Sequence, residues 1–199
     1  MTAFSSPATL RNRDPILGVL RDCLPASGLV LEIASGAGEH AAHMAAHLPG
    51  LRWRPTDPDP NALASIAAWR EASGLETLLA PLRLDAGDPD AWPVAAADAV
   101  VCINMIHISP WTATVGLMAG AGAILPKGGI LYLYGPYREA GLPTAPSNES
   151  FDASLKSRNP AWGLRDREAV EEEAGRNGLR LERRVEMPAN NLSLVFKKG

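Results

Sequence analysis

The glycine turn in residues 30–44, VLEIASGAGEHAAHM, is the first stretch whose composition suggests chemistry. An apolar run ends near Gly36 and Gly38 and leads directly into a helix rich in small residues. Glycine lets such a turn adopt unusual dihedral angles and approach a ligand without a Cβ clash. The turn also satisfies the loose G-x-G-x-x-G/A dinucleotide rule, and glycines occur in strand-to-helix turns for packing alone. A phosphate, a dinucleotide, another cofactor and a purely structural turn all remain open at this point.

Acidic residues at three expected strands narrow these alternatives. Glu32 lies just ahead of the glycines, where a negative charge is unfavourable for a pyrophosphate and suits a cofactor with an amine or a sulfonium. Asp57 ends the second strand at the spacing typical of a carboxylate that accepts from a ribose hydroxyl. Asp85 ends the third strand, where a carboxylate can accept from an adenine amino group. Each aspartate is alternatively an ordinary turn or capping residue. A P-loop is excluded, because no G-x-x-x-x-G-K-[ST] follows the first strand.

Alternating strands and helices form the expected scaffold of these residues. Strands are expected at 28–34, 51–57, within 77–89, within 97–108 and at 130–137. Helices are expected at 14–24, 39–48, 62–72, 111–125 and 164–178. This alternation predicts right-handed crossovers and a mostly parallel sheet. Residues 179–187 and 191–198 predict an antiparallel pair at one edge of the sheet.

Two helix starts and one long loop complete this scaffold. Asp14 is the expected N-cap of the first helix, with Pro15 at its first position. Asn61 is the expected N-cap of the third helix. Residues 135–163 are rich in Pro, Gly, Ser and Asn and predict a long loop after the fifth strand. Long loops in compact domains are usually functional or disordered.

The composition of the 199 residues predicts one domain, residues 1–199. The formal net charge of -3, from 19 Lys+Arg and 22 Asp+Glu, argues against nucleic acid or a membrane as an obligatory partner. No signal-peptide core or membrane-spanning run is evident, so a cytoplasmic location is expected. Cys23 and Cys102 form neither a disulfide framework nor a CxxC motif, and Cys102 is expected to be a small buried hydrophobe.

Four histidines are further candidates for chemistry. His40, His43 and His47 fall on the helix after the glycine turn, and the last two share a face, as a metal pair would. No third ligand is evident in the sequence, so no metal site is predicted and solvated or capping roles are expected. His107 follows the fourth strand and is the best-placed general base, because histidine titrates in the useful pH range. A packed histidine beneath the loop is the alternative.

A resemblance to known protein families covers nearly the whole chain. The segments LEIASGAGEH, PTDPD, LDAGD and INMIHI resemble the successive motifs of class I S-adenosylmethionine-dependent methyltransferases. The segments LRNRDPIL, YGPY, SNESFDASLKSRNPAWGLRD and MPANNLSLVF resemble the methyltransferase-like twenty-six family. The resemblance implies an α/β, Rossmann-like, doubly wound fold with a mostly parallel seven-stranded sheet and a C-terminal antiparallel hairpin. Ala34 departs from the class I pattern, because the usual motif has its first glycine there.

The resemblance further implies S-adenosylmethionine as cofactor and S-adenosylhomocysteine as product. The methionine part of the cofactor is expected to contact Glu32, Ala34, Gly36 and Gly38, and its central region is expected to contact Asn104 and Met105. The ribose diol is expected to bind Asp57, and the adenine end is expected to bind Asp85 and Ala86. The segment with Arg11 and Asn12 is expected to fold over the cofactor. There Arg11 would form a charge-assisted pair with the cofactor carboxylate; an exposed N-terminal charge is the alternative.

Methyl transfer requires mainly in-line alignment, exclusion of water and a deprotonated nucleophile. The expected catalytic residues are His107 and Tyr134, although a base is needed only for an acceptor that is protonated near neutral pH. The residues expected to bind the substrate are Tyr137, Asn148, Phe151, Trp162 and Arg165. Residues 187–191 are expected to form part of the same wall. Alternatively, the aromatic residues only fix the loop.

The expected function is therefore transfer of a methyl group to an O, N or S nucleophile of a small molecule. A cofactor-binding regulatory protein without catalysis is an alternative. A nicotinamide-dependent reductase is a weaker one, because Glu32 disfavours it. A nucleic-acid acceptor is disfavoured, since NMIH follows the fourth strand in place of [DN]-P-P-[YW]. A protein acceptor stays open, and the sequence makes no prediction of the oligomeric state.

Overall fold

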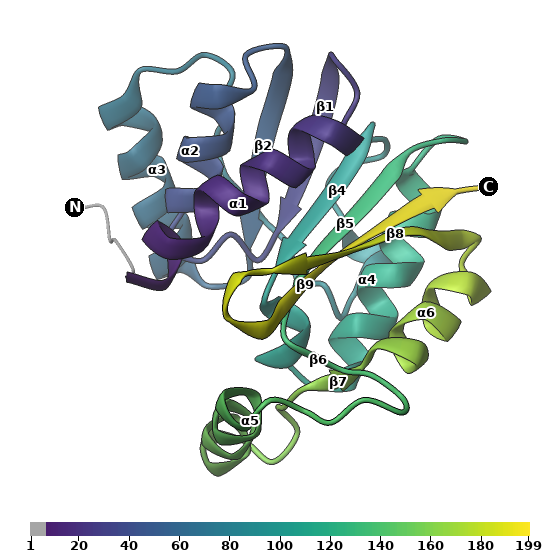
Figure 1. The fold of residues 1–199 in the computed structure, drawn as a ribbon. Helices are drawn as coiled ribbons and strands as arrows, with labels where there is room; N and C mark the ends of the chain where they lie inside the picture. The colour runs from purple at the N-terminus through teal and green to yellow at the C-terminus, as the bar shows by residue number, and fades with distance from the viewer. Residues whose placement is uncertain (1–6) are drawn as a thin grey trace.

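The main sheet combines parallel strands with a C-terminal antiparallel hairpin. The computed structural model describes residues 7–199, and its seven strands have the order β3-β2-β1-β4-β5-β9-β8 (Figure 1). Their bounds are β1 Gly28–Ile33, β2 Leu51–Asp57, β3 Leu82–Arg83, β4 Ala99–Ile103, β5 Ile130–Gly135, β8 Leu179–Met187 and β9 Asn191–Lys198. The first five pair in parallel, whereas β9 is antiparallel to both β5 and β8. The expected α/β fold with a seven-stranded, mostly parallel sheet is confirmed.

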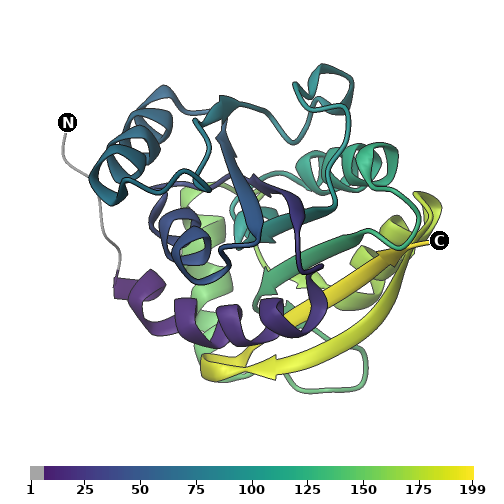
Figure 2. The ribbon, with the colours of Figure 1, turned by 90° about the horizontal axis from the view of Figure 1, so that it is seen from above.

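Helices cover both faces of this sheet. One face carries α1 (Pro7–Cys23), α2 (Glu39–His47) and α3 (Pro60–Ser73), and the other carries α4 (Trp111–Ile124) and α6 (Arg167–Arg176). Seen from above, α1 and α4 lie on opposite sides of the strands (Figure 2). Since both faces are covered, the central strands are apolar along their whole length.

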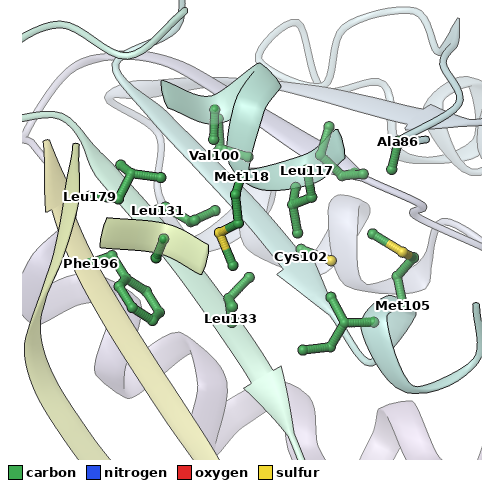
Figure 3. Packing of buried hydrophobic residues seen from close by; sticks show 14 of the residues in the cluster. Ala86, Val100, Cys102, Met105, Leu117, Met118, Leu131, Leu133, Leu179 and Phe196 are labelled. Atoms are coloured by element: carbon green, nitrogen blue, oxygen red, sulfur yellow. The ribbon is translucent and has the colours of Figure 1, made fainter. Parts of the chain in front are cut away.

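Alternate residues of β4 show how the two cores are separated. Val101 packs toward α1 and α2, whereas Val100 and Cys102 pack toward α4. Figure 3 shows this second core, where Leu117 and Met118 of α4 meet side chains from β4 and β5. Cys102 is 1% exposed, which confirms that it is a buried hydrophobe. Both cysteines are free thiols.

Two expected helix starts were wrong. α1 begins at Pro7, so Asp14 is not its cap and Pro15 lies inside it. Its early turns contact α2 through a hydrogen bond between Asn12 and His40 and an ion pair between Arg13 and Glu39. α3 is capped by Asp59, whose carboxylate accepts from the backbone N–H of Asn61, because Pro60 takes the first helical position.

The predicted loop 135–163 contains a helix. α5 (Pro146–Arg158) and a parallel pair, β6 (Tyr137–Arg138) with β7 (Arg165–Asp166), lie beyond the carboxyl end of β5 (Figure 1). The sequence pattern hid α5 because few of its residues are apolar. Its helical state has ordinary causes, with Pro146 in the first turn and Lys156 and Arg158 in the last.

Close packing explains the glycines of α4. A Cβ on Gly116 would overlap the carbonyl oxygen of Ala86, and one on Gly120 would overlap the ring of Trp92. The helix therefore approaches the segment after β3 more closely than any larger residue would allow. Among residues 7–199, no helix is long and apolar enough to cross a membrane.

Candidate functional site

The candidate site lies at the carboxyl edge of the parallel strands. The strand order reverses between β1 and β4, and ligands of open α/β sheets bind in the crevice beside such a point. Because β1, β2, β4 and β5 are parallel, the turns that follow them meet at this edge. The β8–β9 turn (η3, Pro188–Asn190) and α5 approach the same end (Figure 1).

The two glycines after β1 have different surroundings. Both have left-handed backbones, with φ +55° at Gly36 and +88° at Gly38. Among residues 7–199, a Cβ built on Gly36 meets no atom within 4 Å, whereas one on Gly38 lies 2.9 Å from the backbone of Ile66 in α3. Gly38 therefore serves the packing of the turn. Gly36 leaves open space, as a ligand cradle requires.

Ala34 shares the left-handed conformation of these glycines. Its φ is 54°, which costs an L-residue roughly 1–2 kcal/mol. The turn therefore keeps a shape that glycine would favour, although the first glycine of the class I motif is replaced.

Glu32 is buried in β1, 1% exposed, and accepts a hydrogen bond of 2.7 Å from the indole Nε1 of Trp53. Burial raises the pKa of Glu32 to about 7, although hydrogen bonds from Trp53 and Ser35 oppose this shift. A carboxyl with such a pKa is readily ionised by a nearby cation. The contact of Glu32 with the cofactor stays a prediction.

Asp57 ties the end of β2 to the glycine turn. One carboxylate oxygen accepts from the backbone N–H of Gly36 at 2.9 Å, and the other accepts from the N–H of Asp59 at 2.9 Å. Burial raises the pKa of Asp57, and these two hydrogen bonds oppose the shift. An ionised carboxylate has about four lone-pair sites, so this turn role leaves acceptor capacity for a ribose diol.

The segments after β3 and β4 complete the part of the site that surrounds the glycine turn. Asp85 is exposed and accepts from the N–H of Gly87 at 2.8 Å, while Ala86 is buried against α4. Asn104 has φ 64°, and its N–H donates to the carbonyl of Tyr134 at 2.8 Å. Met105 is buried beside it.

Beside this half lies a cavity of about 630 Å³. Its walls come from α1, the turn after β4, the end of β5, α5 and the β8–β9 turn. The lining residues are Arg11, Asn12, Asn104, Ile108, Tyr134, Pro136, Ser147, Asn148, Phe151, Arg158, Pro188, Ala189 and Asn191. The structure thus brings together six of the residues singled out in the sequence, namely Arg11, Asn12, Asn104, Tyr134, Asn148 and Phe151.

Tyr134 is the tyrosine that faces this cavity. Burial raises its pKa, and a hydrogen bond with the side chain of Asn12 opposes the shift. The phenol is therefore protonated at neutral pH and acts as a hydrogen-bond donor or acceptor. Asn12 also bonds His40, at 2.9 Å between its Oδ1 and the ring Nε2. Burial lowers the pKa of His40 to about 4.

His107 lies behind the cavity wall, fully buried against Gly135. Burial, with the charge of Arg165, lowers its pKa to about 3, so the ring is neutral at physiological pH. Within residues 7–199 neither ring nitrogen has a hydrogen-bond partner, and the same holds for the hydroxyl of Tyr137. The two rings meet edge to face with centroids 4.9 Å apart. Tyr137 lines a second cavity of about 340 Å³, on the other side of Asn148.

Asn148 and Asp152 fix α5 in place. The side-chain amide of Asn148 donates to the carbonyl of Asn190 at 2.9 Å, which joins the helix to the β8–β9 turn. Asp152 is 4% exposed and accepts from Arg138, Lys156 and the backbone N–H of Leu164. Phe151, 38% exposed, remains at the cavity.

Arg165 and Trp162 lie outside the lining of both cavities. The guanidinium of Arg165 donates to the carbonyls of Ile106, Ser109 and Ala161, at 2.8, 2.5 and 3.0 Å. The ring of Trp162 packs under the guanidinium of Arg158, with 5.6 Å between the ring centroid and Cζ. In this structure both residues fix the loops around the site.

Backbone strain gathers around the site. Within residues 7–199, four residues other than glycine have positive φ, namely Ala34, Asn104, Ala189 and Asn190. Each lies in a turn at the carboxyl edge, and such conformations cost of order 1–3 kcal/mol apiece. Strained residues of this kind cluster at binding sites.

Ile108, Ser147 and Arg158 line the cavity and were missed in the sequence. Arg158 follows Phe151 by seven residues, so one face of a helix presents both. That spacing would have identified Arg158 if 146–158 had been predicted as helical.

The remaining histidines show local contacts. His43 lies 2.9 Å from a carboxylate oxygen of Asp14, and the ring of His47 bonds the carbonyl of His43 at 2.8 Å. No group of three or more His, Cys, Asp or Glu in residues 7–199 is arranged to hold a metal ion.

Comparisons with known proteins agree with this architecture. The family model "Protein of unknown function (DUF938)" matches residues 3–198. An O-methyltransferase family protein from Burkholderia thailandensis is similar in structure, with a TM-score of 0.82 and 16% identity over 96% of this chain and 57% of that chain. Human N-acetylserotonin methyltransferase, in complex with SAM, has a TM-score of 0.79 and 14% identity over 96% of this chain and 53% of that chain. An O-methyltransferase family 2 protein from Planctomyces limnophilus, in complex with apigenin, has a TM-score of 0.77 and 19% identity over 94% of this chain and 61% of that chain.

These likenesses show a shared fold. The chain spans little more than half the length of each of these three proteins.

Proposed function

Because the chain belongs to the DUF938 family, whose description names no activity, we propose a function from the site itself: methyl transfer from S-adenosylmethionine to a small molecule. The observation that carries this proposal is the open turn at Gly36, to which the carboxylate of Asp57 is bonded, together with the cavity of about 630 Å³ beside it. One compartment suits a cationic cofactor, and the other suits an acceptor.

The residues at the turn fit that cofactor. Ala34 and Gly36 would line its methionine part, and Asp57 has free lone pairs for the ribose diol. Asp85 with Ala86 would hold the adenine, and Asn104 with Met105 the central region. Arg11 and Asn12 of α1 face the cavity and would hold the cofactor carboxylate. When bound, S-adenosylmethionine supplies a methyl group on a sulfonium, which is already activated for displacement.

The protein's own part in the reaction is then alignment and exclusion of water. An acceptor in the cavity forms a bond to the methyl carbon while the carbon–sulfur bond breaks, and sulfur keeps the electron pair. The acceptor's proton leaves to a base or to solvent. We propose Tyr134 as the group that orients the acceptor, because it faces the cavity. His107 is proposed as the base, and proton transfer to it would require the wall at Gly135 to open.

Two features support a small-molecule acceptor. A cavity of about 630 Å³ lies within the range of small-molecule sites, roughly 300–1,000 Å³. The structurally similar Planctomyces limnophilus protein was solved in complex with apigenin. The resemblance of nearly the whole chain to the methyltransferase-like twenty-six family is part of the same proposal.

The proposal is tested by titration calorimetry with S-adenosylhomocysteine. We expect binding by the wild type and a loss of about tenfold or more in Gly36→Asn, because the new side chain fills the open space. Gly74→Asn is the matched control, since Gly74 also has a left-handed backbone (φ +63°) with no atom within 4 Å of its Cβ position. Asparagine tolerates this conformation, so both variants should fold.

Absence of binding at millimolar S-adenosylhomocysteine would defeat the proposal, as would equal losses in both variants. NADH is expected not to bind in a parallel fluorescence titration. Transfer of labelled methyl to a component of a metabolite extract separates an enzyme from a cofactor-binding regulatory protein.

A further inference from the structure

Charge is distributed unevenly around the 630 Å³ cavity. Two arginines, Arg11 and Arg158, belong to its lining, and the lining includes no aspartate or glutamate. The chain as a whole has a net charge of -3. The cavity therefore has a local charge opposite in sign to that of the molecule, which favours anionic ligands.

Most arginines near this region are paired, whereas these two are not. Arg138 pairs with Glu149 and Asp152, and Arg184 pairs with Glu139. Within residues 7–199, no carboxylate forms an ion pair with Arg11 or Arg158.

The arrangement of α5 explains how Arg158 remains unpaired. The acids Glu149 and Asp152 lie on one stripe of the helix, where they bind Arg138 and Lys156. Phe151 and Arg158, seven residues apart, lie on the stripe that faces the cavity. The helix thus neutralises its own acids on one side and leaves a guanidinium on the other.

Arg158 is also oriented. Its Cζ lies 5.6 Å from the centre of the Trp162 ring, and its Nε makes one long contact of 3.4 Å with the carbonyl of Ser154. No hydrogen bond from residues 7–199 occupies its terminal nitrogens, whose fork geometry binds a carboxylate with two hydrogen bonds. Beside this group the cavity presents apolar surface from Ile108, Phe151 and Pro188.

We infer that the acceptor is a carboxylic acid with an apolar, ring-sized body, whose carboxylate is held by Arg158. This inference rests on the proposed function, in which Arg11 is assigned to the cofactor carboxylate. The apolar body lies against Ile108 and Phe151, and Tyr134 orients the nucleophilic end. An anionic acceptor is also attracted by the cationic sulfonium of the bound cofactor, which adds to its selection.

The test uses two fluorescent probes with the same ring system. Naphthalene-2-carboxylate carries the anion, and 2-naphthalenemethanol is its neutral counterpart. Fluorescence titrations are run with and without S-adenosylhomocysteine. We expect the wild type to bind the carboxylate about tenfold more tightly than the alcohol, as a charge-assisted pair at a partly exposed site allows. Arg158→Gln should lose this preference, and Arg158→Lys should keep part of it.

Arg180→Gln is the matched control, because Arg180 is exposed near the start of β8, at the end of the strand away from the β8–β9 turn. It removes the same charge and should leave the preference unchanged. S-adenosylhomocysteine affinity should be equal in wild type and Arg158→Gln. Equal binding of both probes, no binding of the carboxylate at millimolar concentration, or a preference that survives Arg158→Gln would overturn the inference. Failure of the wild type to bind S-adenosylhomocysteine would instead defeat the proposed function, since the probe preference is also measured without it.

Discussion

The two halves of the candidate site are built in different ways. The half around Gly36 consists of backbone turns after β1, β2 and β3, with carboxylates bonded to those turns. The half around the 630 Å³ cavity consists of side chains from α1, α5 and the β8–β9 turn. The first belongs to the sheet itself, and the second is assembled from segments laid over the edge of the sheet. A cofactor common to many proteins suits the first construction, and a particular acceptor suits the second.

If the halves are independent, α5 can be loosened without loss of cofactor affinity. Asp152→Ala should lower the free energy of unfolding by about 3 kcal/mol, because Arg138 and the N–H of Leu164 lose a buried partner. Chemical denaturation measures this effect. Asp152→Asn, which keeps an acceptor for Leu164, should cost less. S-adenosylhomocysteine affinity is expected to stay within about twofold of wild type. A parallel loss of affinity would show that the two halves form one unit.

The stability contributions of His107, behind the cavity, and of Glu32, ahead of the glycine turn, should change with pH in opposite directions. The pKa of His107 is lowered to about 3, so its contribution to stability is complete above pH 6.5 and is lost as the pH falls below it. The pKa of Glu32 is raised to about 7, so its contribution is complete below pH 4.5 and is lost as the pH rises toward 7. Between about pH 7.5 and 5.5 each effect amounts to roughly 1–2 kcal/mol.

Denaturation of His107→Gln and Glu32→Gln at these two pH values measures the difference. Relative to wild type, acidification should be less destabilising for His107→Gln and more destabilising for Glu32→Gln. If the dependence of the free energy of unfolding on pH changes in the same direction in both variants, these pKa shifts are contradicted.

The smallest effects are expected at the two strained alanines, one in each half. Ala34→Gly and Ala189→Gly should each raise the free energy of unfolding by up to about 1 kcal/mol, because relief of left-handed strain exceeds the added entropy of the unfolded chain. Thermal unfolding measures both. A substantial destabilisation by either would show that the methyl group makes a packing contact that outweighs the strain.

Sequence reasoning succeeded where local chemistry determines structure. The continuous apolar run around Cys102 predicted a strand covered on both faces, and the glycines after Glu32 predicted a turn with unusual backbone dihedral angles. The final strands were predicted as an antiparallel pair because the turn PANN joins them. In these segments periodicity, burial and turn chemistry agree.

It failed where tertiary contacts override local preference. The proline-rich composition of 135–163 predicted a loop, but Asn148 and Asp152 anchor a polar helix through partners far along the chain. For His107 the sequence left two roles open, a general base and a packed histidine, because its burial behind Gly135 depends on how β5 lies beside β4.

The position of β9 between β5 and β8 has a consequence for synthesis. β9 leaves the ribosome after the other six strands of this sheet, so β5 lacks its outer neighbour until residues 191–198 have emerged. The turn at Gly36 can assemble from the nascent chain well before then, whereas the wall at Pro188–Asn190 cannot. Translation therefore delivers the two compartments in order, and a ribosome stalled after α6 would display the first without the second.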